Sequence, residues 1–336
     1  MPLRWSLSEK SFELTRTWSI ARGSMSSKTI SFVTVSNGTT KGMGEASCMT
    51  GYPYTHLDIR NQFEALEAIH FFDELTSIED LHRRTREEKI SPPLRFAIES
   101  AWVHYECLAK GQSLADYLGV SLPEKIQIGY SIPIVDDKKI NQEIERAKPY
   151  GFIKIKVNQK NMVEVVLKVA DQLKQALIVD ANEAFTNSAD FVKAVEPLRH
   201  LNIAFIEQPF SKKYEALYQE IFGKTLVPIV LDESIETMDD YLRLKPWVDG
   251  INVKLQKTGS YFEALRLMKI AKSDHKLVML GCSLETSLGI WGAAHLADYA
   301  DFCDLDGATL LANEPFGLVA YTEGSPYMTV QKDLVF

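Results

Sequence analysis

The sequence predicts an α/β fold in which the larger part of the chain forms a closed parallel barrel and an α+β block precedes it. Strand patterns alternate with helix patterns from about residue 123 to about residue 306, and eight strands can be distinguished there. Eight strands in alternation with helices favour a closed barrel. An open doubly wound sheet stays an alternative, although no G-x-G-x-x-G motif follows any of these strands.

Length, charge and cysteine content narrow the class of protein. The 336 residues suffice for one large barrel and a smaller domain. With 37 basic and 45 acidic residues the net charge is −8, which argues against nucleic acid or an anionic membrane as a partner and favours a small molecule or a metal. The four cysteines form no C-x-x-C pair, and no uninterrupted apolar stretch is long enough to cross a bilayer. We therefore expect a cytoplasmic protein.

The first block, residues 1–122, begins with a predicted three-stranded meander. Strands are expected at 3–16 and 28–36, where β-forming residues alternate, and a third strand follows the hairpin turn signal Asn37-Gly38. Between the first two strands lies segment 17–27, which is rich in small residues and offers little to pack. We expect this segment to be a mobile flap.

The rest of the first block has a helical period from residue 58 to 110. The best-marked helix begins after Ser91 as N-cap, with Pro92 in its first turn, and ends before Gly111. A meander followed by helices is an α+β pattern.

Residues 123–315 supply the predicted barrel. Its strands are expected at 126–133, 152–157, 176–181, 204–208, 229–233, 250–255, 277–282 and near Asp304. The tail, 316–336, is expected to form a short-stranded closing segment that returns to the first block.

Charged residues recur at the carboxyl end of five successive strand candidates: Lys156, Asp180, Glu207, Asp232 and Lys254. Neighbouring members of this series are separated by about the length of one β/α unit. The carboxyl ends of barrel strands converge on one mouth, which is where such folds keep their active sites. The spacing therefore predicts one site built from five strands.

The strand candidate at 152–157 carries two lysines. Successive side chains of a strand point to opposite faces, so Lys154 and Lys156 share one face and the branched apolar residues share the other. Taken alone, this pattern fits an edge strand with a solvated lysine face equally well. The other strand ends favour a face that points into the barrel.

Three carboxylates stand at neighbouring strand ends and need a cation to remain together. Mg²⁺ is the natural candidate, because Asp180, Glu207 and Asp232 supply hard oxygen ligands. Asn182 and Glu233 would hold these ligands from behind. Taken singly, the two aspartates fit helix N-caps better, and the glutamate fits a solvated strand end. Their common register favours the metal site.

Several motifs accompany these residues: Gly42-Met43-Gly44-Glu45, Lys154-Ile155-Lys156, Asp180-Ala181-Asn182, Glu207-Gln208-Pro209, Asp232-Glu233-Ser234, Asn252-Val253-Lys254 and Lys257-Thr258-Gly259. Their combination resembles the muconate-lactonizing branch of the enolase superfamily. The resemblance implies a modified TIM barrel, (β/α)7β, under an α+β capping domain. It also implies one Mg²⁺ per subunit on the three carboxylates, with Lys156 and Lys254 as acid and base on opposite faces of the substrate.

Proton transfer next to a carboxylate is the chemistry that such a site would support. The proton is weakly acidic, and a metal on the carboxylate oxygens stabilises the charge that develops when the proton leaves. Two lysines on opposite faces can remove a proton from one side and return it from the other, which is racemisation or epimerisation. Lys154 is expected to lower the pKa of the neighbouring Lys156.

The substrate is suggested by Asp304-Leu305-Asp306 after the last strand. A pair of carboxylates suits a cationic group, although a helix cap and a solvated aspartate are the alternative. The pair, and the loop that contains Cys282 and Ser283, resemble dipeptide epimerases of the L-Ala-D/L-Glu type, in which the carboxylates hold the dipeptide's ammonium group.

Two cap segments would meet the side chain of the substrate. Arg22 matches an arginine that serves substrate recognition in the L-Ala-D/L-Glu members, and loop 47–56 offers a methionine and tyrosines. The C-terminal residue of the dipeptide is therefore expected to be Glu or apolar.

The preferred hypothesis is a Mg²⁺-dependent dipeptide epimerase that inverts the α-carbon of the C-terminal residue through an enediolate, and that assembles as a homo-oligomer. The alternatives are an N-acylamino acid racemase, an o-succinylbenzoate synthase or a cycloisomerase of the same branch. A binding protein without turnover is a further alternative, which the complete set of lysines and carboxylates disfavours.

Overall fold

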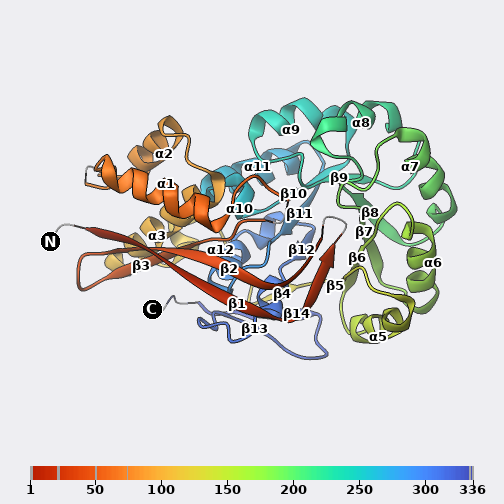
Figure 1. The fold of residues 1–336 in the computed structure, drawn as a ribbon, viewed down its shortest axis with the longest axis horizontal. Coiled ribbons are helices and arrows are strands. Elements are labelled where there is room, and N and C mark those ends of the chain that lie inside the picture. Colours follow the sequence, from red (N-terminus) through yellow and green to blue (C-terminus); the bar gives the residue numbers. More distant parts are fainter. Residues whose placement is uncertain (1–2, 21–22, 50, 74, 333, 335–336) are drawn as a thin grey trace.

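The computed structural model describes residues 3–20, 23–49, 51–73, 75–332 and 334. The chain forms a cap, drawn in red to yellow in Figure 1, and a barrel, drawn in green to blue, which pack against each other. No helix in these ranges is long and apolar enough to cross a membrane.

The cap has one antiparallel sheet, in the order β1-β2-β3, and a layer of helices. Its elements are β1 (Arg4–Ile20), β2 (Gly23–Ser36), β3 (Lys41–Ala46), α1 (His56–Ala68), α2 (Ile78–Glu87), α3 (Pro92–Lys110) and α4 (Leu114–Leu118). The Asn37 side chain accepts hydrogen bonds from the backbone N–H groups of Thr39 and Thr40, which closes the expected turn between β2 and β3. The predicted α+β pattern is confirmed.

Helix α3 follows the sequence signals closely. It begins after Ser91 with Pro92 in its first turn and ends at Gly111, whose φ of 63° only glycine adopts readily. The Ser91 side chain, however, makes no capping hydrogen bond. Strand β3 packs closely on this helix, since a Cβ atom at Gly44 would lie 2.1 Å from Ser100 Oγ.

The two faces of β2 pack against different parts of the molecule. Ile30 and Phe32 are buried in the core that the cap shares with the barrel. Val33 and Val35 are buried in a separate core with the cap's own helices. The period of two in this strand therefore decides which side chains look toward the barrel.

The described part of segment 17–27 is a hairpin, and its mobility as a flap stays a prediction. Strand β1 continues to Ile20, β2 begins at Gly23, and Trp18 pairs with Met25 after a shift of register. Cross-strand hydrogen bonds hold the two strands of this hairpin together. The hairpin extends from the cap to the barrel in Figure 1, and Ile134 N–H donates to Ser19 O there.

The barrel is an eight-stranded parallel sheet in the order β12-β11-β10-β9-β8-β7-β6-β5. Its strands are β5 (Tyr130–Ile132), β6 (Phe152–Lys156), β7 (Ala176–Asp180), β8 (Ile203–Glu207), β9 (Ile229–Leu231), β10 (Gly250–Val253), β11 (Leu277–Gly281) and β12 (Phe302–Asp304). A parallel bridge between Ile128, two residues before β5, and Cys303 of β12 closes the sheet, so the predicted barrel is confirmed.

Helices connect these strands in sequence, in the (β/α)7β pattern. They are α5 (Asp137–Ala147), α6 (Met162–Gln172), α7 (Ser188–Val195), α8 (Ala216–Ile221), α9 (Met238–Leu244), α10 (Leu255–Thr258), α11 (Tyr261–Ser273) and α12 (Ser287–Ala294). Short 3-10 turns stand beside them: η1 (Glu196–Leu198), η2 (Lys212–Tyr214), η3 (Lys245–Trp247), η4 (Ala297–Tyr299) and η5 (Gly307–Leu310).

The lumen and the wall of the barrel have separate cores. Apolar side chains fill the lumen below the mouth: Phe152, Ile178, Phe205, Val230 and Met279. Ile153, Ile155 and Val157 of the lysine strand pack outward into the large core with the helices. This strand is therefore central, and its lysines share the lumen side.

The first barrel strand differs from the expectation. Segment 126–133 is divided into β4 (Lys125–Gln127) and β5, and β4 forms a small sheet with β14 (Tyr327–Val330) and β13 (Val319–Tyr321). The tail thus pairs with β4. It also contacts the cap, because the ring centroids of Phe316 and Phe32 are 5.6 Å apart.

Candidate active site

A pocket lies where the barrel mouth faces the cap. The barrel contributes Ser131, Lys154, Lys156, Asn182, Asp232, Glu233, Lys254, Cys282, Ser283, Leu284, Asp304, Asp306, Gly307 and Leu310, and the cap contributes Trp18, Lys28 and Met49. Lysines and carboxylates of the predicted series therefore meet in one place, although they come from distant parts of the chain.

The two lysines of β6 lie at different depths of this pocket. Lys154 is 1% exposed, and its ammonium contacts three carboxylates: Asp180 at 3.1 Å, Glu207 at 2.9 Å and Asp304 at 2.9 Å. Lys156 lies nearer the mouth and contacts the same Asp180 oxygen at 2.5 Å. Although burial opposes it, the charges of these carboxylates raise the pKa of Lys154 well above its ordinary value. The positive charge of Lys154 thus interacts with three carboxylates as well as with the neighbouring Lys156.

The first two carboxylates are neighbours across the sheet. Asp180 of β7 and Glu207 of β8 are register partners, and both are fully buried. Burial raises the pKa of Asp180, but the charges of Lys156 and Lys154 prevail and lower it to about 2. Burial and the negative charge of Asp180 raise the pKa of Glu207 to about 7. The negative charge of Glu207 is therefore less well compensated than that of Asp180.

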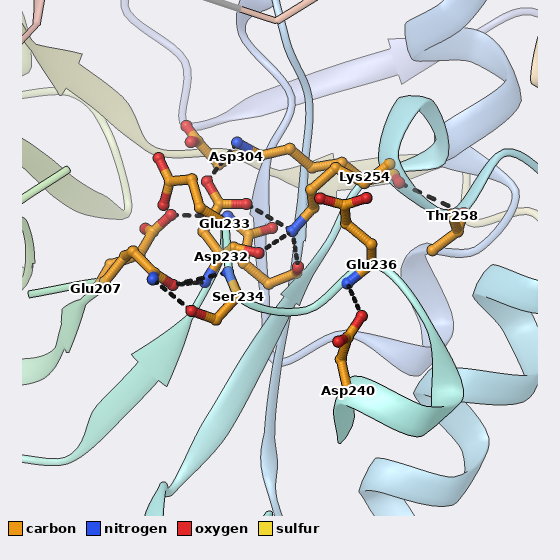
Figure 2. A network of polar contacts seen from close by, with 12 residues as sticks. Glu207, Asp232, Glu233, Ser234, Glu236, Asp240, Lys254, Thr258 and Asp304 are labelled. Carbon is orange, nitrogen blue, oxygen red and sulfur yellow. Dashed lines mark hydrogen bonds and ion pairs between the residues drawn. The ribbon is translucent and has the colours of Figure 1, made fainter. Parts of the chain in front are cut away.

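Asp232 follows β9 and is held between two cations. Lys254 Nζ contacts its Oδ2 at 2.6 Å, and Lys257 Nζ contacts its Oδ1 at 2.6 Å. Figure 2 shows Asp232 and Lys254 together with Glu207 and Asp304, although each comes from a different strand end. Gly281 leaves room for the side chain of Lys254, because a Cβ atom at position 281 would lie 3.0 Å from Lys254 Cε. Lys257 was not predicted as a site residue.

Polar groups behind the carboxylates fix their positions. Asn182 N–H donates to Asp180 Oδ1 at 3.0 Å, and its side-chain amide lies 3.4 Å from Glu233 Oε1. Both residues expected to support the ligands therefore lie beside them.

Two further supports were missed by sequence reasoning. The Asn252 amide donates to Glu207 Oε1 at 2.9 Å, and Gln208 Oε1 accepts from the Asp232 N–H at 2.9 Å. The inward parity of Asn252 was a usable signal, because it shares a face with Lys254. Gln208 reaches its partner through a left-handed φ of 40°, which no local pattern predicts.

The donor set suits a hard divalent cation. Asp180, Glu207 and Asp232 offer carboxylate oxygens within a buried region, and the side-chain oxygens of Asn182 and Asn252 are buried without a hydrogen-bond donor in the described structure. Among the described residues, no three acidic, imidazole or thiol groups already converge as a finished metal cage. The ammonium groups of Lys154, Lys156 and Lys254 contact these carboxylates.

The two aspartates after β12 have different surroundings. Asp304 is buried, accepts a hydrogen bond from Ser131 Oγ at 3.2 Å and contacts Lys154. Asp306 is half-buried in the pocket wall, and burial together with the charge of Asp304 raises its pKa to about 7. Asp304 thus has Lys154 as its cationic partner, whereas Asp306 lacks a compensating charge. A cation that entered the pocket would meet both carboxylates.

The loop after β11 joins the pocket to the cap. Ser283 Oγ lies 3.1 Å from Ser47 Oγ, and Ser47 Oγ donates to the Leu284 carbonyl oxygen at 2.6 Å. Burial raises the pKa of Cys282 well above its ordinary value, so this thiol stays protonated. Cys282 and Ser283 thus line the pocket as neutral groups.

The cap side of the pocket includes one residue of the expected loop 47–56 and two others. Arg22 lies outside the described residues. Trp18, Lys28 and Met49 line the pocket, and only Met49 had been noted. The signal for Lys28 was available, because it continues the row of Ile30 and Phe32, which face the barrel.

Comparisons with known proteins agree with this geometry. Residues 139–318 match the family model described as enolase C-terminal domain-like. An L-Ala-D/L-Glu epimerase of Escherichia coli is 29% identical over 95% of this chain and 98% of its own length. A hydrophobic dipeptide epimerase of a Flavobacteria bacterium is 30% identical over 71% of each chain.

A solved structure extends the likeness to the whole fold. It is an enolase family member from Agrobacterium tumefaciens with homology to dipeptide epimerases, solved with sodium and L-Ala-L-Glu. It is 26% identical, covers 98% of each chain and has a TM-score of 0.85. From the match of the family model over more than half of its length, this chain belongs to the enolase C-terminal domain-like family.

Proposed function

We propose that this protein is a Mg²⁺-dependent epimerase that inverts the α-carbon of the C-terminal residue of a dipeptide. The observation that carries the proposal is the pair of lysines at the mouth. Lys156 ends β6 and Lys254 follows β10, so three strands that end in carboxylates separate them. A substrate bound between them would present opposite faces to the two ammonium groups.

The names of the relatives support a dipeptide as the substrate. The Escherichia coli and Flavobacteria proteins are both named as dipeptide epimerases, and the Agrobacterium protein was solved with L-Ala-L-Glu. These names differ in the side chain that they specify. The class of substrate is therefore better supported than the identity of its C-terminal residue.

One Mg²⁺ per subunit would be held by Asp180, Glu207 and Asp232. When bound, the metal would stabilise the negative charge that develops on the α-carboxylate of the substrate as the α-proton leaves. A Lys base combined with Mg²⁺ is the general arrangement of the enolase superfamily. Asn182 and Glu233 would orient the carboxylates from behind.

The two lysines would exchange roles with the direction of reaction. One neutral amine takes the α-proton from its face, and the opposite ammonium delivers a proton to the other face. Atoms balance, because one C–H bond breaks and another forms at the same carbon. Lys154 would keep the carboxylates Asp180 and Glu207 in position through its ion contacts.

The ammonium group of the dipeptide would lie beside Asp304 and Asp306. The contact of Asp304 with Lys154 leaves Asp306 as the carboxylate with unbalanced charge. The contact of Asp304 with Lys154 supports an N-acylamino acid racemase as a second candidate, because a carboxylate that already has a cationic partner needs none from the substrate.

Exchange of the α-proton tests the proposal. Dipeptides L-Ala-L-Xaa and matching N-acetyl amino acids are incubated with enzyme and Mg²⁺ in D₂O, and deuterium at the α-carbon is followed by mass spectrometry. We expect exchange with inversion in the dipeptides, and loss of exchange after chelation of the metal. Exchange in the acylated compounds alone would select the second candidate, and no exchange in either set would refute both.

The cellular location and the assembly are proposed separately from the activity. We infer a cytoplasmic enzyme, which agrees with four cysteines that are free in the structure. A homo-oligomer is proposed from the family resemblance, and sedimentation velocity measures it directly.

A further inference from the structure

The cap side of the pocket holds a cation that the proposed mechanism does not use. Lys28 lies on β2 two residues before Ile30, so its side chain leaves the strand toward the barrel. It is half-buried and lines the same pocket as Lys156 and Lys254. Lysine side chains are usually exposed, so a partly buried lysine in a pocket indicates a partner or a function.

The ammonium of Lys28 has hydrogen-bond capacity to spare. In the described residues it donates to one acceptor, the Cys48 carbonyl oxygen, and forms no ion pair. An ammonium carries three N–H donors, so two of them are not used by the described residues, and the side chain lines the pocket. The three other lysines of the pocket, Lys154, Lys156 and Lys254, each contact at least one carboxylate.

The acidic side chains that act on Lys28 from nearby are engaged elsewhere. Glu45 is buried and accepts hydrogen bonds from the Thr286 hydroxyl and N–H. Glu285 accepts from the Ser283 N–H at 2.8 Å. Burial raises the pKa of both carboxyls, which reduces the charge that they present to Lys28.

Apolar side chains share this pocket with Lys28. Trp18 and Met49 line the cap side of the pocket, and Leu284 and Leu310 line the barrel side. A charge pair formed among such side chains is screened less than one in water, so a single cation there discriminates strongly between charged and neutral groups.

The contacts of the proposed function direct the side chain of the substrate's C-terminal residue toward the cap. The lumen below is filled by apolar residues such as Phe205. In the proposed function, the α-carboxylate points to the carboxylates of the metal site and the ammonium group points to Asp306. The side chain of the C-terminal residue is then directed toward the cap.

We propose that Lys28 binds a carboxylate on the side chain of the C-terminal residue, and so selects acidic dipeptides such as L-Ala-L-Glu. The inference rests on the proposed function, because that function orients the dipeptide. It assigns the choice between an acidic and an apolar residue to the cap strand β2. Lys28 is thus a specificity residue, distinct from the lysines that move the proton.

The test compares three isosteric or near-isosteric dipeptides: L-Ala-L-Glu, L-Ala-L-Gln and L-Ala-L-Met. For each, kcat/KM for α-proton exchange is measured with wild type, Lys28→Met, Lys28→Arg and the control Lys10→Met. Lys10 is exposed on β1 of the same hairpin and does not line the pocket. Binding of each dipeptide to the Mg²⁺-loaded enzyme is measured in parallel by calorimetry.

Lys28→Met should lower kcat/KM for L-Ala-L-Glu by about 30-fold, as expected for one lost charge-assisted contact, and change the values for Gln and Met dipeptides by less than about threefold. Lys28→Arg should retain part of the preference for Glu, and Lys10→Met all of it. Equal losses on all three dipeptides, or no preference for Glu in wild type, would overturn the proposal.

Calorimetry separates this proposal from the proposed function. Tighter binding of L-Ala-L-Glu than of L-Ala-L-Gln without any exchange would support the role of Lys28 in binding and contradict the epimerase activity. Exchange without a charge preference would support the epimerase activity and contradict the role of Lys28. Absence of both binding and exchange would reject both.

Discussion

The barrel mouth and the inner face of the cap meet in one pocket, but they are held in different ways. At the mouth, Lys154 is 1% exposed and contacts three carboxylates, and Asp232 is fixed between two lysines. On the cap, Trp18 and Lys28 reach the pocket from a two-stranded hairpin, and Lys28 has one acceptor among the described residues.

This difference separates two tasks. Buried, mutually contacting charges keep a geometry that proton transfer requires, and removing one member leaves the others uncompensated. A hairpin over the mouth can change its side chains without disturbing that network. We expect substitutions at the mouth to change the rate of reaction and substitutions on the cap to change the choice of substrate.

The largest effect is expected at Lys254. Lys254→Met should lower kcat for epimerisation by at least about 1,000-fold, because one face of the substrate loses its proton donor. Trp18→Phe on the cap should change kcat by less than about threefold, since it keeps an aromatic ring in the wall of the pocket. Polarimetry and deuterium exchange measure both. Exchange without inversion in Lys254→Met would show that Lys156 still works alone, and a small effect on both readouts would contradict the comparison.

An intermediate effect is expected at the aspartates beyond β12. Asp306→Asn should raise KM for a dipeptide by about 30-fold and leave kcat nearly unchanged, because a charged contact to the ammonium is lost. Asp304→Asn should lower kcat as well, since Lys154 would lose one of its three carboxylates. Steady-state kinetics separates the two parameters. Identical effects of the two variants on kcat and KM would contradict the different roles assigned to Asp304 and Asp306.

The smallest effect on the chemistry is expected from Gly44 in the cap. A Cβ at this position would lie 2.1 Å from Ser100 Oγ, so Gly44→Ala should lower the free energy of unfolding by about 2 kcal/mol through overpacking. Thermal unfolding measures this change, with Ser26→Ala on the exposed part of β2 as control. The kcat of the folded variant should stay within about twofold of wild type. A large loss of kcat would show that the cap contributes to the chemistry itself.

Most of the barrel mouth was predictable because its signals are local. Five successive strands, β6 to β10, end in a charged residue or are followed by one, and the closure of a parallel barrel brings such ends together. Lys156, Asp180 and Glu207 accordingly lie on neighbouring strands in register. The roles of these residues as acid, base and metal ligands stay predictions that the kinetic tests address.

The cap was predicted less completely, for a physical reason. The small residues of segment 17–27 suggested a mobile flap without indicating the strand pairing that joins Trp18 to Met25 in its described part. The alternation of β2 places Lys28 on the same face as Ile30 and Phe32. Only the packing of the barrel on that face places Lys28 in the pocket.

The sequence by itself determined the alternation of elements, the faces of the strands and the residue types at their ends, because these depend on neighbours along the chain. Only the tertiary structure decided which charges meet. Lys154 pairs with Asp304 across 150 positions of the chain, Lys257 joins Asp232, and the tail pairs with β4. Such partners depend on how the barrel closes and how the cap packs on it, and no local pattern records either.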